Sequence, residues 1–159
     1  MSSSGWPSLI LLLALVLATA GIAGACTGNS NTTGWYASLA KPSWTPPNWV
    51  FGPVWTALYA NMAVAAWLVW RRRPRQRVGW AMGLFSLQLI LNIAWTPIFF
   101  GLQRPGLALV DILLLWLAIG MTFAAFYRIR PLAGWLLVPY LLWVSFASAL
   151  NMAIWSLNA

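Results

Sequence analysis

Residues 106–127 read GLALVDILLLWLAIGMTFAAFY, and this stretch decides the fold class. Its only charged side chain is Asp111. The hydrocarbon core of a bilayer is about 30 Å thick, so a helix that crosses it needs about 20 consecutive apolar residues. This stretch satisfies that length, and it therefore predicts a membrane-spanning helix.

Four further apolar runs have a similar length, at residues 7–26, 49–70, 78–100 and 132–155. The whole chain is 62% hydrophobic and only 6% charged, with a mean hydropathy of +0.78. Strands of a membrane barrel would be shorter and would alternate in polarity. We therefore predict an all-α integral membrane protein, with residues 1–159 forming one domain of five transmembrane helices.

The first run has an alternative interpretation as a signal peptide. Residues 1–8 carry no lysine or arginine, however, and the apolar stretch continues through Ala25, which favours a retained span. Cys26 follows a small-residue segment that resembles a lipoprotein cleavage site but lacks the usual leucine. As the only cysteine, Cys26 has no partner for a disulfide within the chain.

The positive charges predict the orientation in the membrane. Residues 71–77 hold five of the nine basic side chains, and Arg128 and Arg130 lie in the connection on the same side. Only Lys41 and Arg104 lie on the other side. Loops rich in lysine and arginine stay in the cytoplasm, so we expect the N-terminus inside and the C-terminus outside. This pattern indicates contact with anionic membrane lipids and not with nucleic acid.

The connection at residues 27–48 is long and rich in Gly, Asn and Pro, which predicts an ordered loop. Its prolines favour an extended backbone, and Asn48 is placed to cap the second span. We expect Tyr36, Trp44, Pro46 and Pro47 to form a stiff aromatic lid on the outer side. An interfacial aromatic belt would explain the same aromatic residues.

Aromatic and amide side chains share faces on three spans. Trp55 and Tyr59 are one helical turn apart, as are Asn92 and Trp95, while Trp143, Ala147 and Asn151 follow one another at steps of four. With a rise of 1.5 Å per residue, the three groups lie about 9–18 Å below the outer surface. Amides are costly in lipid unless they are satisfied, so Asn92, Asn151 and Gln88 should face the bundle interior.

Two interpretations of this cluster remain open. The amides could hold the bundle together by hydrogen bonds between helices. Alternatively, the aromatic rings could wall a pocket for a flat, mostly apolar ligand, with Ala147 leaving room between its neighbours. For Asp111 a structural role is favoured, with Arg104, indole N–H groups or amides as its partners.

The residue inventory excludes several classes of function. The chain has no histidine, which removes the commonest metal and haem ligand and any histidine-activated nucleophile. A single acidic side chain cannot form a carboxylate pair for acid–base catalysis. No glycine-rich phosphate loop precedes a helix. We therefore expect no metal site, no required cofactor and no ATP-driven step.

Four ordered motifs resemble the TspO/MBR family, the tryptophan-rich sensory proteins and translocator proteins. They are residues 35–59 (WYASLAKPSWTPPNWVFGPVWTALY), residues 88–101 (QLILNIAWTPIFFG), residues 108–111 (ALVD) and residues 139–151 (PYLLWVSFASALN). The resemblance covers roughly residues 34–155. It implies five transmembrane helices, often as a homodimer.

The resemblance also implies a ligand and a site. Family members bind porphyrins and haem-related tetrapyrroles, and isoquinoline-carboxamide or benzodiazepine-type drugs. Their pocket carries over onto Trp55, Tyr59, Asn92, Trp95, Trp143, Ala147 and Asn151. The function implied is a membrane receptor or carrier in tetrapyrrole handling or stress sensing.

Two other functions are compatible with the sequence. One is a light-dependent enzyme that degrades porphyrin, for which the resemblance implicates Trp55 and Trp143. The other is a structural or regulatory membrane partner without a small ligand of its own. The C-terminal sterol motif of animal members is absent, because Met152 replaces its tyrosine and no basic residue follows. This end indicates a bacterial protein, for which we expect the cytoplasmic membrane.

Overall fold

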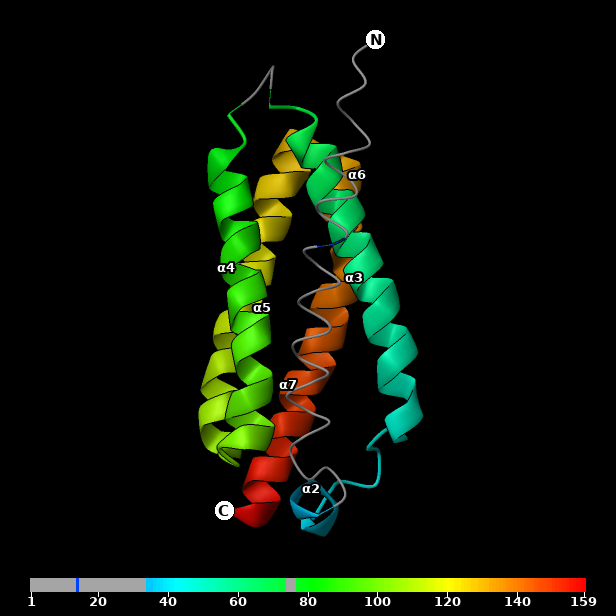
Figure 1. Cartoon of the computed structure of the whole chain (residues 1–159), viewed down its shortest axis with the longest axis vertical. Coiled ribbons are helices and arrows are strands. Elements are labelled where there is room, and N and C mark those ends of the chain that lie inside the picture. The colour runs from blue at the N-terminus through cyan, green and yellow to red at the C-terminus, as the bar shows by residue number, and fades with distance from the viewer. Residues whose placement is uncertain (1–13, 15–33, 74–76) are drawn as a thin grey trace.

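The computed structural model describes Ala14, residues 34–73 and residues 77–159, and this part of the chain contains helices and loops without a strand (Figure 1). The elements are α2 (Trp35–Ser38), α3 (Asn48–Trp70), α4 (Gly79–Thr96), the π-helical turn η1 (Pro97–Gly101), α5 (Pro105–Ile129), α6 (Pro131–Trp135) and α7 (Val138–Asn158). Four stretches are long and apolar enough to cross a membrane: 48–70, 79–101, 105–129 and 131–158. These confirm four predicted spans. The fifth, at residues 7–26, lies outside the described residues apart from Ala14.

Two details of the predicted helices are wrong. Asn48 is the first residue of α3 and not its cap; Pro47 holds the capping position, and no side chain bonds to the helix end there. The span predicted at residues 132–155 is not one continuous helix, because it is broken between α6 and α7, and Pro139 lies in the first turn of α7. A proline is tolerated in a first turn because the amide hydrogen it lacks would have no partner there.

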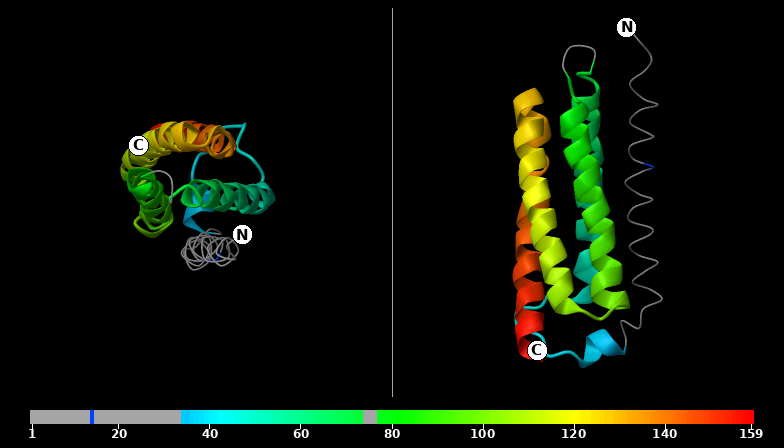
Figure 2. Two further views of the ribbon diagram at one scale, coloured as in Figure 1. Left: turned by 90° about the horizontal axis from the view of Figure 1, so that it is seen from above. Right: turned by 90° about the vertical axis from the view of Figure 1, so that its left-hand side faces the viewer.

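Helix α5 packs along both α4 and α7. Helix α3 meets α6 at the end that carries the arginine-rich connection 71–77, and Figure 1 shows it diverging from α7 toward the opposite end. The backbones of α3 and α7 hardly approach each other. Figure 2 shows the same arrangement from above and from the side. Side chains must therefore fill the space between α3 and α7.

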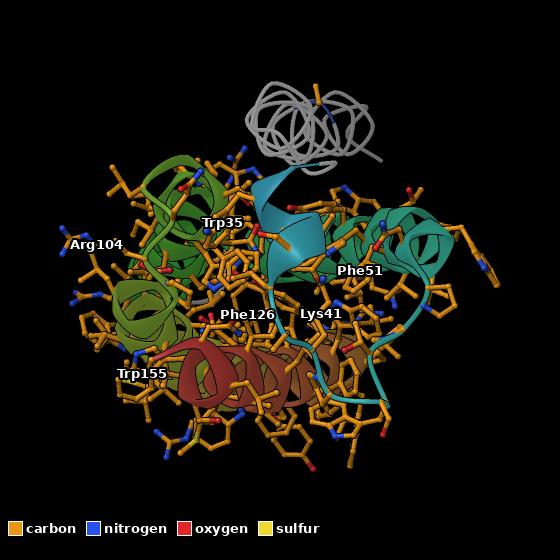
Figure 3. The ribbon with its side chains drawn as sticks, turned by 90° about the horizontal axis from the view of Figure 1, so that it is seen from below. Trp35, Lys41, Phe51, Arg104, Phe126 and Trp155 are labelled. Atoms are coloured by element: carbon orange, nitrogen blue, oxygen red, sulfur yellow. The ribbon has the colours of Figure 1, made fainter. Side chains whose placement is uncertain are left out.

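The segment from Gly34 to Pro47 crosses the end of the bundle at which α7 finishes. It contains one short helix, α2, where the sequence predicted only a loop. Seen from below, this segment passes over the space between α3 and α7 (Figure 3). We call residues 34–47 the lid segment, and its role as a lid stays a prediction.

Candidate ligand site between α3, α4 and α7

One face of α3 supplies the aromatic wall of the site. Phe51, Trp55 and Tyr59 follow each other at steps of four and therefore project from the same side of the helix. Tyr59 is buried, whereas Phe51 and Trp55 are half-buried. This gradient follows the helix as it diverges from its neighbours.

Asn92 of α4 joins α3 to α7 through two hydrogen bonds. The Tyr59 hydroxyl donates to Asn92 Oδ1 at 2.8 Å, and Asn92 Nδ2 donates to the Tyr140 hydroxyl oxygen at 3.0 Å. All three side chains are buried. Because a buried amide costs free energy unless it is hydrogen-bonded, this network satisfies Asn92 and fixes the three helices against one another.

Tyr140 was missed by the sequence analysis. It is fully buried, yet the spacing that could have identified it is visible, since Tyr140 lies on α7 three residues before Trp143 and seven before Ala147. A tyrosine on an inward face is expected to place its hydroxyl on a polar partner.

Trp55 points into the bundle. Its indole stacks on Tyr59, with ring centroids 5.4 Å apart and planes inclined by 30°. The same indole meets Tyr140 edge-on at 6.1 Å. Trp55 therefore bridges α3 and α7 beside the hydrogen-bonded network.

Trp143 bridges the same two helices nearer to the lid segment. Its ring meets Phe51 edge-on at 5.8 Å and lies 5.6 Å from Phe146. Trp44 of the lid segment packs against Phe146 at 5.7 Å. Trp55 and Trp143 thus belong to one aromatic layer. Phe51, one turn from Trp55, contacts Trp143, and Tyr140, one turn from Trp143, contacts Trp55.

Trp95 and Asn151 form a second group, on the side of the site that faces α5. The Trp95 indole N–H donates to Asn151 Oδ1 at 3.1 Å, and Asn151 Nδ2 donates to the Pro105 carbonyl at 2.8 Å. Trp95 also stacks on Phe99 of η1 at 4.9 Å. Ala147 is half-buried and packs against the core cluster that contains Tyr59 and Tyr140. The other six predicted residues divide between two groups, with Trp95 and Asn151 in the second.

The lid segment is attached to the bundle at several points. Tyr36 meets Phe99 and Phe100 edge-on, at 6.1 and 5.5 Å. The Lys41 ammonium lies 4.7 Å from the centre of the Tyr36 ring. Burial raises the pKa of Tyr36 above its ordinary value of 10.0. Pro46 is half-buried, while Pro47 is exposed at the start of α3.

The motifs that carry this geometry are shared with known proteins. The sequence profile of the TspO/MBR family matches residues 12–156. The chain belongs to the TspO/MBR family. Both clusters and the lid segment lie within the matched region.

Relatives of this TspO/MBR protein include animal, bacterial and archaeal proteins. It is 48% identical to the translocator protein of Homo sapiens over 126 residues, which cover 78% of this chain and 75% of the human one. It is 45% identical over 152 residues to the tryptophan-rich protein TspO of Chlorobaculum tepidum, with 95% and 96% covered. A tryptophan-rich sensory protein of Cereibacter sphaeroides is 41% identical over 124 residues, with 78% and 77% covered.

Two polar groups of the TspO/MBR bundle lack partners within the described residues. Gln88 is buried as predicted, and its Nε2 lies 3.8 Å from Met62 Sδ, but its Oε1 has no hydrogen-bond partner there. Asp111 is also buried, and its Oδ2 has no hydrogen-bond partner within the described residues. Its expected partner Arg104 is exposed. In residues 34–73 and 77–159 no group of His, Cys, Asp and Glu side chains could hold a metal ion.

Proposed function

We propose that this protein is a membrane receptor or carrier that binds a porphyrin or a related tetrapyrrole between α3, α4 and α7. The observation that carries the proposal is the aromatic layer formed by Phe51, Trp55, Tyr140 and Trp143. Side chains alone hold this layer together, because the backbones of α3 and α7 hardly approach each other. The lid segment covers the end of the bundle next to it.

The ring contacts across the layer are weak enough for a ligand to replace. Trp55 with Tyr140 and Phe51 with Trp143 are edge-on pairs at 6.1 and 5.8 Å. Aromatic pairs of this kind contribute about 0.5–1.5 kcal/mol each beyond the area they bury. A planar macrocycle inserted between α3 and α7 would exchange these edge contacts for stacking against the ring faces.

Polar groups around the layer suit a ligand with a few hydrogen-bonding atoms. Asn92 offers its amide at the inner end, and Lys41 lies in the lid segment at the outer end. The Lys41 ammonium is held by the carbonyls of Ala37 and Leu39, at 3.3 and 3.2 Å. A propionate of the macrocycle would find a positive charge there. The exposed Arg104 is the second cation on this side.

The names of the relatives support this role. They include translocator and sensory proteins, and both names fit a membrane protein that takes up a ligand. Isoquinoline-carboxamide and benzodiazepine-type compounds are flat and aromatic, and we propose that they compete for the same layer. The homodimer implied by the family resemblance stays a prediction.

A titration with protoporphyrin in detergent tests the proposal. We expect saturable quenching of tryptophan fluorescence and a shifted porphyrin absorbance. The double variant Trp55→Ala with Trp143→Ala should weaken binding by about five- to 150-fold, because two stacking contacts of about 0.5–1.5 kcal/mol each are lost. The matched control is Trp49→Ala with Trp80→Ala, since these rings are 75% and 76% exposed. Equal affinities of the two double variants would contradict the site.

The same samples separate the alternative functions. The complex is illuminated and its absorbance spectrum is followed. A new pigment that forms with the wild-type protein, but not with the Trp55 and Trp143 double variant, would indicate the porphyrin-degrading enzyme. Bleaching at the rate of free porphyrin in detergent would argue against it. A wild-type protein that shows no saturable binding would leave the structural or regulatory partner.

A further inference from the structure

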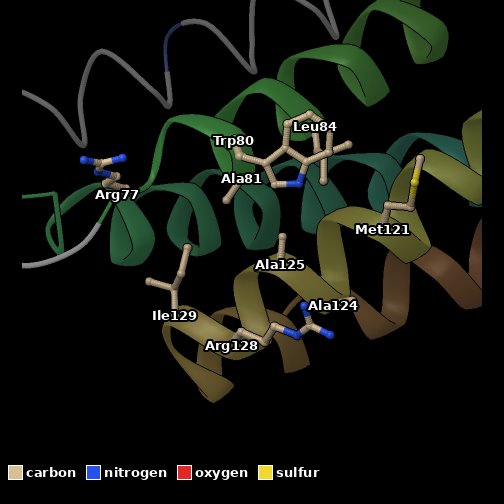
Figure 4. Close-up of a pocket in the computed structure, with 9 residues that line it drawn as sticks. All are labelled: Arg77, Trp80, Ala81, Leu84, Met121, Ala124, Ala125, Arg128 and Ile129. Carbon is tan, nitrogen blue, oxygen red and sulfur yellow. The ribbon is translucent and has the colours of Figure 1, made fainter.

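A groove separate from the aromatic layer lies between α4 and α5 at the end that carries the arginine-rich connection (Figure 4). Its volume is about 370 Å³. The α4 side is lined by Arg77, Trp80, Ala81 and Leu84, and the α5 side by Met121, Ala124, Ala125, Arg128 and Ile129. The ligand proposed above does not use this groove.

The groove has one basic end and one apolar end. Arg77 precedes α4 and Arg128 lies near the end of α5, so both arginines are attached at the arginine end of the bundle. Figure 4 shows their side chains directed apart, with the Arg128 guanidinium beside Ala124. Leu84 and Met121 lie seven residues further into the membrane on each helix, which is about 10 Å of helix. Between the two ends the groove is lined by Ala81, Ala124 and Ala125, whose small side chains leave space for a chain. The lining therefore suits an amphiphile with an anionic head and an apolar chain.

The protein itself cannot neutralise these two arginines. Its only acidic side chain is Asp111, which lies on α5 about 25 Å of helix away from Arg128. Both arginines are exposed, and within the described residues neither forms an ion pair. A second copy of the chain, with a net charge of +8, would bring more positive charge to the same place. Charge complementarity thus favours an external anion.

We propose that this groove is a binding site for one anionic phospholipid, with the exposed Arg77 and Arg128 side chains turning toward its phosphate and one acyl chain along Ala81, Ala124 and Ala125. Trp80, Met121 and Ala124 of the lining are exposed on two helices that are long and apolar enough to cross a membrane, next to which phospholipid is the abundant amphiphile. Guanidinium groups pair with phosphate through charge-assisted hydrogen bonds. Trp80, 76% exposed at the rim, is placed as an interfacial aromatic beside the headgroup.

Photo-crosslinking of the full chain in phosphatidylcholine vesicles tests the site. The probe is a phosphatidylglycerol with a diazirine on one acyl chain, and peptides that carry adducts are identified by mass spectrometry. We expect adducts on the α4 and α5 peptides that line the groove. A phosphatidylcholine with the same diazirine should label these peptides several-fold less. Equal labelling by the two lipids would overturn the proposal.

Matched charge variants distinguish this site from general attraction to a basic surface. Arg77→Gln with Arg128→Gln should reduce groove adducts by up to about thirtyfold, in line with the contribution of about 1 kcal/mol from each basic residue near an anionic surface. The control, Arg71→Gln with Arg73→Gln, removes the same charge from arginines that lie on the Trp67 and Trp70 rings outside the groove. An equal loss in both double variants would show that only surface charge matters, and it would overturn the site.

A variant that keeps both arginines tests the apolar half of the groove. Ala124→Phe should fill the groove and reduce the adducts, while far-ultraviolet circular dichroism and gel filtration show an intact protein. Undiminished groove labelling in this folded variant would overturn the placement of the chain. Displacement of the lipid probe by protoporphyrin, or crosslinks from the groove to a second copy, would assign the groove to those occupants instead. Neither outcome would change the test of the aromatic layer.

Discussion

Asn158, at the end of α7, binds both backbone groups of Ala40, which lies 118 residues earlier in the chain. The Ala40 N–H donates to Asn158 Oδ1 at 3.0 Å, and Asn158 Nδ2 donates to the Ala40 carbonyl at 2.9 Å. The pair ties the lid segment to the end of the bundle. It lies beside Lys41, so it also positions the cation that we propose for a ligand carboxylate.

Asn158→Ala should loosen the lid segment. Each lost hydrogen bond contributes about 0.5–1.5 kcal/mol, and both face solvent, so the lid should open more often without unfolding the bundle. Hydrogen–deuterium exchange of the peptide around Ala40 should rise several-fold, and porphyrin should associate and dissociate faster. Ser156→Ala is the matched control, because the Ser156 hydroxyl bonds only to the Ala153 carbonyl of its own helix. Exchange unchanged in Asn158→Ala would show that the aromatic contacts alone hold the lid.

Asn92→Leu should cost both stability and affinity. The substitution leaves the hydroxyl groups of Tyr59 and Tyr140 without their shared partner, and each buried polar group left unsatisfied costs about 1–3 kcal/mol. Thermal unfolding in detergent should shift down, and porphyrin affinity per folded molecule should fall. Ser86→Ala, an exposed change on the same helix, should do neither. A loss of stability with full affinity would support the alternative in which the amide only holds helices together.

Two glycines should respond in opposite ways to alanine. A Cβ on Gly134 of α6 would lie 3.0 Å from Tyr127 Cα and 3.1 Å from Tyr127 N, which are backbone atoms of α5. Gly134→Ala must push α6 away from α5 and should destabilise the protein by about 1–3 kcal/mol. Gly83 of α4 has open space around it, so Gly83→Ala should be neutral or stabilising by up to about 1 kcal/mol. Equal unfolding temperatures would contradict the close α5–α6 contact.

Tyr36 should ionise later than an exposed tyrosine. Burial raises its pKa above 10.0, so the folded state favours the neutral phenol. The stability that this provides is complete below pH 10.0 and is lost as the pH rises through the folded pKa. In a pH titration, the tyrosinate absorbance that the wild-type protein shows and Tyr36→Phe lacks belongs to Tyr36. The midpoint of this difference should lie above pH 10.0. A midpoint at the ordinary value would contradict the burial of Tyr36.

The membrane spans within the described residues could be predicted because they depend on local properties. An apolar run of sufficient length must be helical in a bilayer, since only a helix satisfies its backbone internally. The same reasoning placed Gln88, Asn92 and Asn151 inside the bundle, and all three are buried. The break between α6 and α7 was missed because Pro139 does not reveal whether it lies inside a helix or in its first turn.

The choice of partners was decided only by the tertiary structure. A spacing of four shows that Asn92 and Trp95 lie near one face, but helix rotation and crossing decide that Asn92 joins Tyr59 to Tyr140 while Trp95 binds Asn151. Likewise, the composition of the lid segment predicted a stiff loop but not its attachment to Asn158. Hydrogen bonds and ring contacts require atoms to meet within a few ångströms, and residues distant in sequence reach that proximity only when the whole bundle has packed.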